Sequence, residues 1–103
     1  LYVIKKNGDK KPFDRDKIFR SIMTAARKRD IDHELIENMV NDIVFKLEAS
    51  GEGEISTAAI GEIIMENLAK IDQVTYVRFA SVYRDFCEAK DFLKFVETLK
   101  SKR

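Results

Sequence analysis

An Asn-Gly dipeptide followed closely by a helix start constrains this chain more than any other feature of its sequence. Asn7-Gly8 lies between two short runs in the stretch VIKKNGDKKPFDRDKI, residues 3–18. This dipeptide suits a two-residue hairpin turn, because both central positions of that turn need a positive φ. The sequence therefore predicts a tight β-hairpin with the cross-strand pairs Lys6–Asp9, Lys5–Lys10, Ile4–Lys11 and Tyr2–Phe13.

The predicted register brings like charges together across the hairpin. It places Tyr2, Ile4 and Phe13 on one face and Lys5 beside Lys10 on the other. Like charges directly opposite one another destabilise a sheet unless an anion lies between them. Lysines also protect exposed edge strands from aggregation. Composition alone leaves both interpretations open.

Helix-start signals follow the hairpin. Asp14 is a good N-cap, and Phe13 with Ile18 has the spacing of a hydrophobic staple. Similar patterns start helices near Asp32, at Ser56 and at Asp72. The helix after Asp72 is expected to cover residues 73–89, and a fifth helix carries residues 92–99. The helix over residues 73–89 bears an aromatic stripe made of Tyr76, Phe79, Tyr83 and Phe86. The segment GEIS, residues 53–56, is a candidate third strand.

Composition and motifs favour a binding domain over an enzyme. The chain of 103 residues fits one domain, residues 1–103, and no apolar run approaches the ~20 residues of a membrane span. We expect a cytoplasmic protein with no membrane partner. One cysteine (Cys87) and one histidine (His33) cannot complete a zinc site or a catalytic set. Neither GxxxxGK[ST] nor GxGxxG occurs.

The positive charge is concentrated at the N-terminal end. Residues 1–29 carry a net charge of +7, whereas residues 30–103 carry −6. The basic hairpin and the N-terminus of the first helix together suit phosphate groups. Tyr2 and Phe13 interleave with the lysines, which also suits nucleic acid. The spacing of these lysines and aromatic residues does not distinguish binding of a nucleotide from binding of a nucleic acid.

The stretch VIKKNGDKKPFDRDKI resembles the opening of the ATP-cone domain, a nucleotide-sensing module of ribonucleotide reductases and of the bacterial NrdR repressors. It has a strand ending in Lys-Lys, a turn, Pro-Phe-Asp and a helix-opening Lys-Ile. The stretches EISTAAIGEIIMENLAKID and TYVRFASVYRDFCEAKDF resemble the version in the NrdR family. The resemblance implies an α+β ATP-cone, in which a short hairpin or three-stranded lid covers a bundle of four to five helices.

The resemblance also implies a ligand and the residues that hold it. ATP or dATP would bind between lid and bundle, commonly with Mg²⁺. The implied nucleotide-binding residues are Val3, Lys5, Lys6, Lys11, Pro12, Phe13, Lys17 and Thr57. Many members of the family have Glu where this chain has Lys11. Lysine cannot accept hydrogen bonds from ribose or adenine as a carboxylate does.

Regulation by assembly is a further implication of the resemblance. Similar proteins repress ribonucleotide reductase genes when dATP accompanies or replaces ATP, because the nucleotides set how cones form homo-oligomers. Operator DNA is bound by an N-terminal zinc ribbon with four cysteines; this sequence contains none of it, so zinc would belong to that segment. We expect the oligomer interface to use residues 76–86 with Phe92, Leu93 and Phe95. The alternatives are the N-terminal allosteric cone of a ribonucleotide reductase and a plain nucleic-acid-binding domain.

Overall fold

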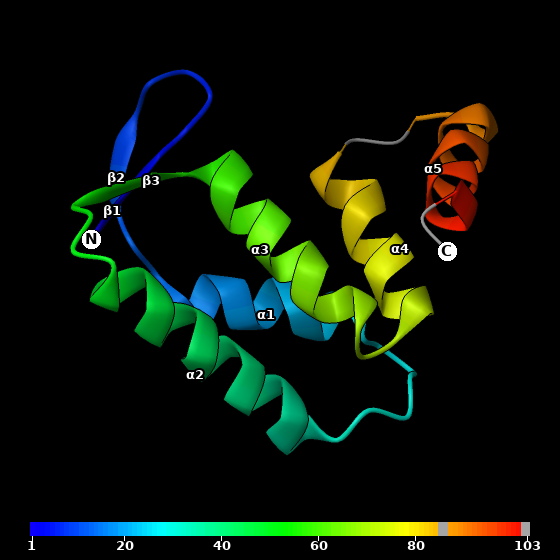
Figure 1. Cartoon of the computed structure of the whole chain (residues 1–103), viewed down its shortest axis with the longest axis horizontal. Helices are drawn as coiled ribbons and strands as arrows, with labels where there is room; N and C mark the ends of the chain where they lie inside the picture. The colour runs from blue at the N-terminus through cyan, green and yellow to red at the C-terminus, as the bar shows by residue number, and fades with distance from the viewer. Residues whose placement is uncertain (85–86, 102–103) are drawn as a thin grey trace.

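The computed structural model of the protein describes residues 1–84 and 87–101. In chain order its elements are β1 (Tyr2–Ile4), β2 (Lys10–Pro12), α1 (Arg15–Ala25), α2 (His33–Ala49), β3 (Glu54–Ser56), α3 (Thr57–Ala69), α4 (Gln73–Tyr83) and α5 (Ala89–Ser101). Figure 1 shows the small sheet at one end of the helices, with α3 leading directly away from β3. The predicted α+β fold is confirmed. No helix in the described ranges is long and apolar enough to cross a membrane.

The three strands form one sheet with β1 in the middle. The strand order is β2-β1-β3, with β1 antiparallel to β2 and parallel to β3. The candidate strand in GEIS is confirmed as β3, in which Ile55 pairs with Val3. Because β3 runs straight into α3, the sheet fixes where that helix begins.

The predicted hairpin register is wrong by one residue. The observed pairs are Tyr2–Pro12, Val3–Lys11 and Ile4–Lys10. The backbone N–H of Lys5 donates to the Asp9 carbonyl (2.8 Å), and that of Gly8 donates to the Lys5 carbonyl (2.9 Å). Gly8 alone in the turn has a positive φ, at 91°. The connection therefore has three residues, a type I turn followed by a left-handed glycine, instead of two.

The Asn7 side chain gives a physical reason for the longer turn. Its Oδ1 accepts the backbone N–H of Asp9 (2.9 Å), and its Nδ2 donates to the Asp9 carboxylate (3.0 Å). Asparagine often stabilises a turn by bonding the backbone two residues ahead in this way. Asn7 therefore stabilises the turn with its side chain while its own φ stays negative.

The shift of one residue changes which residues of the two strands share a face, so that Lys10 lies with Tyr2 and Lys5 lies with Lys11. Lys10 now lies on the outer face, with its ammonium 4.9 Å from the centre of the Tyr2 ring. It also pairs with Glu54 of β3, which raises the pKa of Lys10. The prediction that Lys5 and Lys10 repel each other across the hairpin is therefore wrong. Lys5 shares the inner face with Val3 and Lys11 instead.

Side-chain caps start the helices where the sequence predicts them. The carboxylate of Asp14 accepts the backbone N–H groups of Asp16 (3.0 Å) and Lys17 (3.4 Å). Ser56 caps α3 and Asp72 caps α4 in the same manner. Below the sheet, the helices enclose a core that includes Ile18, Ile22, Ile36, Val40, Ile60, Ile64, Leu68 and Ala80.

The helix predicted over residues 73–89 is shorter in the structure. α4 ends at Tyr83, and α5 begins at Ala89. Asp91 accepts the backbone N–H groups of Cys87 (3.0 Å) and Glu88 (3.1 Å), a capping arrangement that starts a new helix there. The predicted aromatic position Phe86 lies outside the described residues.

The expected interface residues divide into core and surface. Phe95 is 6% exposed and its ring lies 5.3 Å from that of Tyr76, so both belong to the core. Burial in the core leaves Phe95 and Tyr76 little surface for contacts between cones, while the interface itself stays a prediction. Phe92 and Leu93 are 40% and 64% exposed.

A polar cluster joins the loop that follows α1 to the start of α4. Arg29 donates to both carboxylate oxygens of Asp72 (2.9 Å each), and the Thr75 hydroxyl also donates to Asp72 (2.7 Å). Arg78 donates to the Arg27 carbonyl (2.7 Å). The hydrogen bond from Arg29 and those from Thr75 hold the pKa of Asp72 well below its usual range.

We expect Asp72→Ala to lower the melting temperature by several degrees at neutral pH, because it removes both the cap of α4 and the partner of Arg29. The pKa of Asp72 is lowered on folding, so its stabilisation is complete above the unfolded value of about 4 and is lost as the pH falls below it. Thermal unfolding of the variant and of the control Asp42→Ala, followed by circular dichroism against pH, checks this. Equal effects of the two substitutions would contradict it.

Candidate functional site

A pocket of about 420 Å³ lies between the sheet and the helices α1, α3 and α4. Its size falls within the range of small-molecule sites, roughly 300–1,000 Å³. Its lining residues come from the sheet, from the N-terminal turns of α1 and α3 and from α4: Val3, Lys5, Lys11, Pro12, Phe13, Asp14, Lys17, Ile18, Ser21, Thr57, Ile60, Gly61, Ile64, Phe79 and Tyr83.

The structure brings together most of the residues that the sequence singled out. Val3, Lys5, Lys11, Pro12, Phe13, Lys17 and Thr57 all line this one pocket. Lys6 lies in the hairpin turn, is exposed and is not among the lining residues. Lys6 falls in the turn that projects beyond the last pair of β1, so its side chain lies in solvent instead of the pocket.

Three lysines of the pocket lie within electrostatic reach of one another. The Lys11 ammonium contributes most to lowering the pKa of Lys5, and the charge of Lys17 adds to it, while Asp9 offsets a smaller part. Like charges lower the pKa of an amine because they disfavour its protonated form. An anion placed among the three ammonium groups would remove this repulsion.

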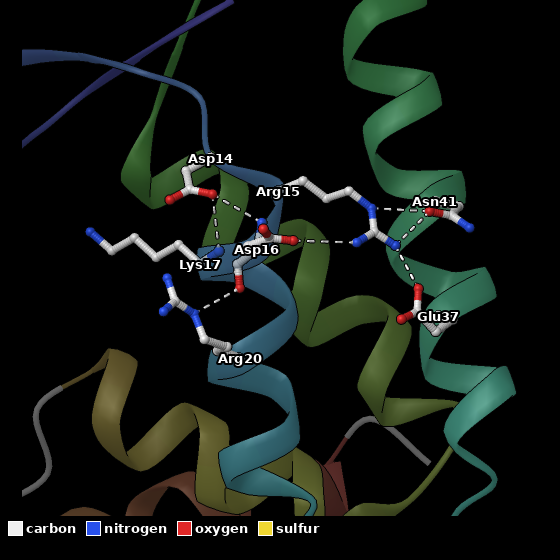
Figure 2. Close-up of polar contacts among 7 residues, drawn as sticks. All are labelled: Asp14, Arg15, Asp16, Lys17, Arg20, Glu37 and Asn41. Carbon is white, nitrogen blue, oxygen red and sulfur yellow. Dashed lines mark hydrogen bonds and ion pairs between the residues drawn. The ribbon is translucent and has the colours of Figure 1, made fainter.

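The first turn of α1 places Lys17 on the pocket side. Figure 2 shows Lys17 and Arg20 extending away from α2, whereas Arg15 reaches toward it. Arg15 donates to the Glu37 carboxylate (2.7 Å) and to the side-chain amide oxygen of Asn41 (2.7 and 3.1 Å), both on α2. This network fixes the turn from its far side. The Asp14 carboxylate already occupies the N–H groups of Asp16 and Lys17, so fewer backbone donors remain for a ligand than the sequence suggested.

Sequence reasoning missed the aromatic wall of the pocket. The rings of Phe79 and Tyr83 stack with their centres 6.1 Å apart, and the Tyr83 hydroxyl donates to the Ala58 carbonyl (2.7 Å). A Cβ on Gly61 would lie only 2.1 Å from a ring carbon of Tyr83. Glycine destabilises the interior of a helix, so its presence there often indicates that another group packs closely against the backbone. Gly61 in the predicted third helix was therefore the signal available in the sequence.

The pocket offers few ligands for a metal ion. Asp14 is its single lining carboxylate, and one of its oxygens serves as the helix cap. Across the described ranges, no three His, Cys, Asp or Glu side chains gather closely enough to hold a metal ion. These residues do not build a Mg²⁺ site from protein ligands.

Comparison with protein families matches residues 1–89 to the ATP cone domain. The chain belongs to the ATP cone family. Among curated proteins, this cone is 57% identical over 99 residues to "Transcriptional repressor NrdR" of Rhodospirillum rubrum, covering 96% of the chain and 65% of that protein. It is 61% identical over 92 residues to the protein of the same name from Rhodopseudomonas palustris strain BisA53, covering 89% of the chain and 58% of that protein.

A third relative, from Acidiphilium cryptum, is 59% identical over 99 residues and is also named "Transcriptional repressor NrdR". The cone covers 66% of that protein, so it spans less than two thirds of the relatives it matches. These names describe repressors and not enzymes, in agreement with the binding domain expected from the sequence.

We expect Gly61→Ala to disrupt the aromatic wall of the cone. The new methyl group cannot fit against Tyr83, so the substitution should destabilise the fold by about 1–3 kcal/mol. Gly53→Ala is the matched control, because a Cβ at Gly53 meets nothing within 4 Å. Chemical denaturation of both variants measures the difference. Equal stability of the two variants would show that Tyr83 does not pack on Gly61.

We expect Lys11→Gln to raise the pKa of Lys5, because the substitution removes the charge that lowers it most. Nitrogen-detected NMR titration of the lysine side chains measures this shift. Lys70→Gln, at the far end of α3 from Thr57, is the matched control and should leave Lys5 unchanged. An unchanged Lys5 pKa in Lys11→Gln would rule out the contact between the two ammonium groups.

Proposed function

We propose that this ATP cone binds ATP and dATP in the pocket and acts as the nucleotide-sensing regulatory domain of a transcriptional repressor. The observation that carries the proposal is the position of Lys5, Lys11 and Lys17 around one pocket. Membership of the ATP cone family and similarity to proteins named as repressors support it.

The chemistry of the pocket suggests how a nucleotide would lie. The triphosphate meets the three lysines at the side of the hairpin and of the first turn of α1. The base and sugar lie against the apolar part formed by Ile60, Ile64, Phe79 and Tyr83. Thr57, in the first turn of α3, adds a hydroxyl group next to the positive end of the helix dipole.

The proposed output is a change of assembly. ATP and dATP would favour different homo-oligomers of the cone, because each ligand stabilises the state that it binds better. The exposed apolar side chains Val82 on α4 and Leu93 on α5 would contribute to contacts between cones. In the complete protein, the assembly would control binding of operator DNA by an N-terminal zinc ribbon, and the genes controlled would be those of ribonucleotide reductase.

Two other readings make different predictions. An allosteric cone of a ribonucleotide reductase would use the same pocket, but the similarity of 57–61% to proteins named as repressors favours the repressor. A nucleic-acid-binding surface would need its lysines on an open face. Lys11 and Lys17 are exposed, but together with the half-buried Lys5 they line one pocket that also has an apolar part, which favours a small ligand.

We expect ATP and dATP to bind the chain saturably in calorimetric titrations, and light scattering on the same samples should give different particle masses for the two nucleotides. Lys5→Gln should weaken both affinities about tenfold or more, because charge-assisted hydrogen bonds are worth about 1.5–3 kcal/mol. Lys70→Gln should change neither. The proposal fails if neither nucleotide binds saturably, and its assembly step fails if both give one mass.

A further inference from the structure

We propose that the pocket binds triphosphate as the metal-free anion in preference to the Mg²⁺ complex, so that free Mg²⁺ lowers its occupancy. This inference rests on the proposed function, because it concerns the charge state of the ligand in the same pocket. Its basis is the set of charged side chains around the pocket and the absence there of a suitable group of metal ligands among the described residues.

The described side chains neutralise little of the charge of the three pocket lysines, since Asp9 offsets only a small part of the repulsion at Lys5. Across the part of the chain that the structure describes, no ion pair joins Lys5, Lys11 or Lys17 to a carboxylate. Lys10, by contrast, pairs with Glu54 on the outer face of the sheet. Among the lysines of the hairpin that the structure describes, the ion pair therefore lies on the outer face, and the inner face is left for the ligand.

The acidic and hydroxyl groups of the pocket offer little to a metal ion. Mg²⁺ in phosphate sites commonly uses one or two carboxylates besides the phosphates. Asp14 is the single lining carboxylate, and one of its oxygens accepts two backbone N–H groups of α1. The Ser21 hydroxyl donates to the Ile18 carbonyl at 2.7 Å. A cation brought in with the nucleotide would meet ammonium groups in place of carboxylates.

The difference in charge between metal-free ATP and its Mg²⁺ complex determines which of the two binds more tightly. Chelation by Mg²⁺ reduces the charge of ATP from about −4 to about −2, which weakens its Coulomb attraction to the lysines. The metal-free form gains more from the pocket because the ammonium groups replace the metal as counter-charge. Since the lysines are partly exposed, salt screens the effect, and the expected preference is about three- to tenfold.

The preference adds a second input to the nucleotide sensor. Occupancy would rise with the concentration of triphosphate that is free of metal, and this fraction increases as free Mg²⁺ falls. The cone would then respond to magnesium availability together with the nucleotide pool, although it holds no magnesium itself.

Calorimetric titration of ATP into the full chain in two buffers of equal ionic strength, one with EDTA and one with excess MgCl₂, tests this inference. We expect the dissociation constant to be about three- to tenfold larger with MgCl₂, and the ratio of the two constants to shrink as KCl is added. Equal affinities, or tighter binding with MgCl₂, would overturn the inference and leave the nucleotide site intact. Failure of ATP to bind in either buffer would overturn the proposed function itself.

Matched lysine variants test the cause of the preference. Lys11→Gln should weaken binding of metal-free ATP more than binding of the Mg²⁺ complex, so the ratio between the buffers moves toward one. Lys70→Gln removes the same charge outside the pocket and should keep the ratio of the unmodified chain. Thermal unfolding confirms that each variant is folded, and Lys17→Gln replaces Lys11→Gln if the latter is not. An unchanged ratio in the pocket variant would overturn the assignment to the lysines.

Discussion

β1 forms hydrogen bonds along both of its edges, and this pairing positions the rest of the site. On one side it pairs antiparallel with β2, which leads through Asp14 into α1. On the other side it pairs parallel with β3, which continues into α3 at Thr57. The starts of two helices are thereby fixed on either side of one strand, and Lys17 and Thr57 line the same pocket although they are distant in sequence.

The arrangement of charge follows from the same pairing. A turn of three residues puts Lys5 and Lys11 on the inner face, where their repulsion lowers the pKa of Lys5. Lys10 lies on the outer face, where Glu54 neutralises it. Repulsion retained inside a pocket is destabilising in the free protein, and its relief by a bound anion adds to affinity. On this proposal, the basic hairpin serves a bound anion as well as any protection of a sheet edge.

Features of the fold that depend on local sequence were predicted better than features that depend on long-range packing. The caps at Asp14, Ser56 and Asp72 are predictable because a side chain bonds the backbone within a few residues. The register of the hairpin was not, because Asn-Gly also fits a turn of three residues, and only the hydrogen bonds of Asn7 decide between them. The contact of Tyr83 with Gly61 joins two helices, so the glycine in the sequence marks a close approach but does not identify Tyr83 as the residue that makes it. The family resemblance predicted seven of the residues that line the pocket, whereas the aromatic wall became apparent only in the structure.

The central claim is that the pocket between the sheet and α1, α3 and α4 is the nucleotide site. An NMR titration of the isotope-labelled chain with ATP, followed through the backbone amides, tests it most directly. The account predicts saturable shifts at Val3, Lys17, Thr57 and Gly61, which surround the pocket from four elements. Shifts confined to the basic residues 27–29 in the loop after α1, or no saturable shifts at all, would contradict it.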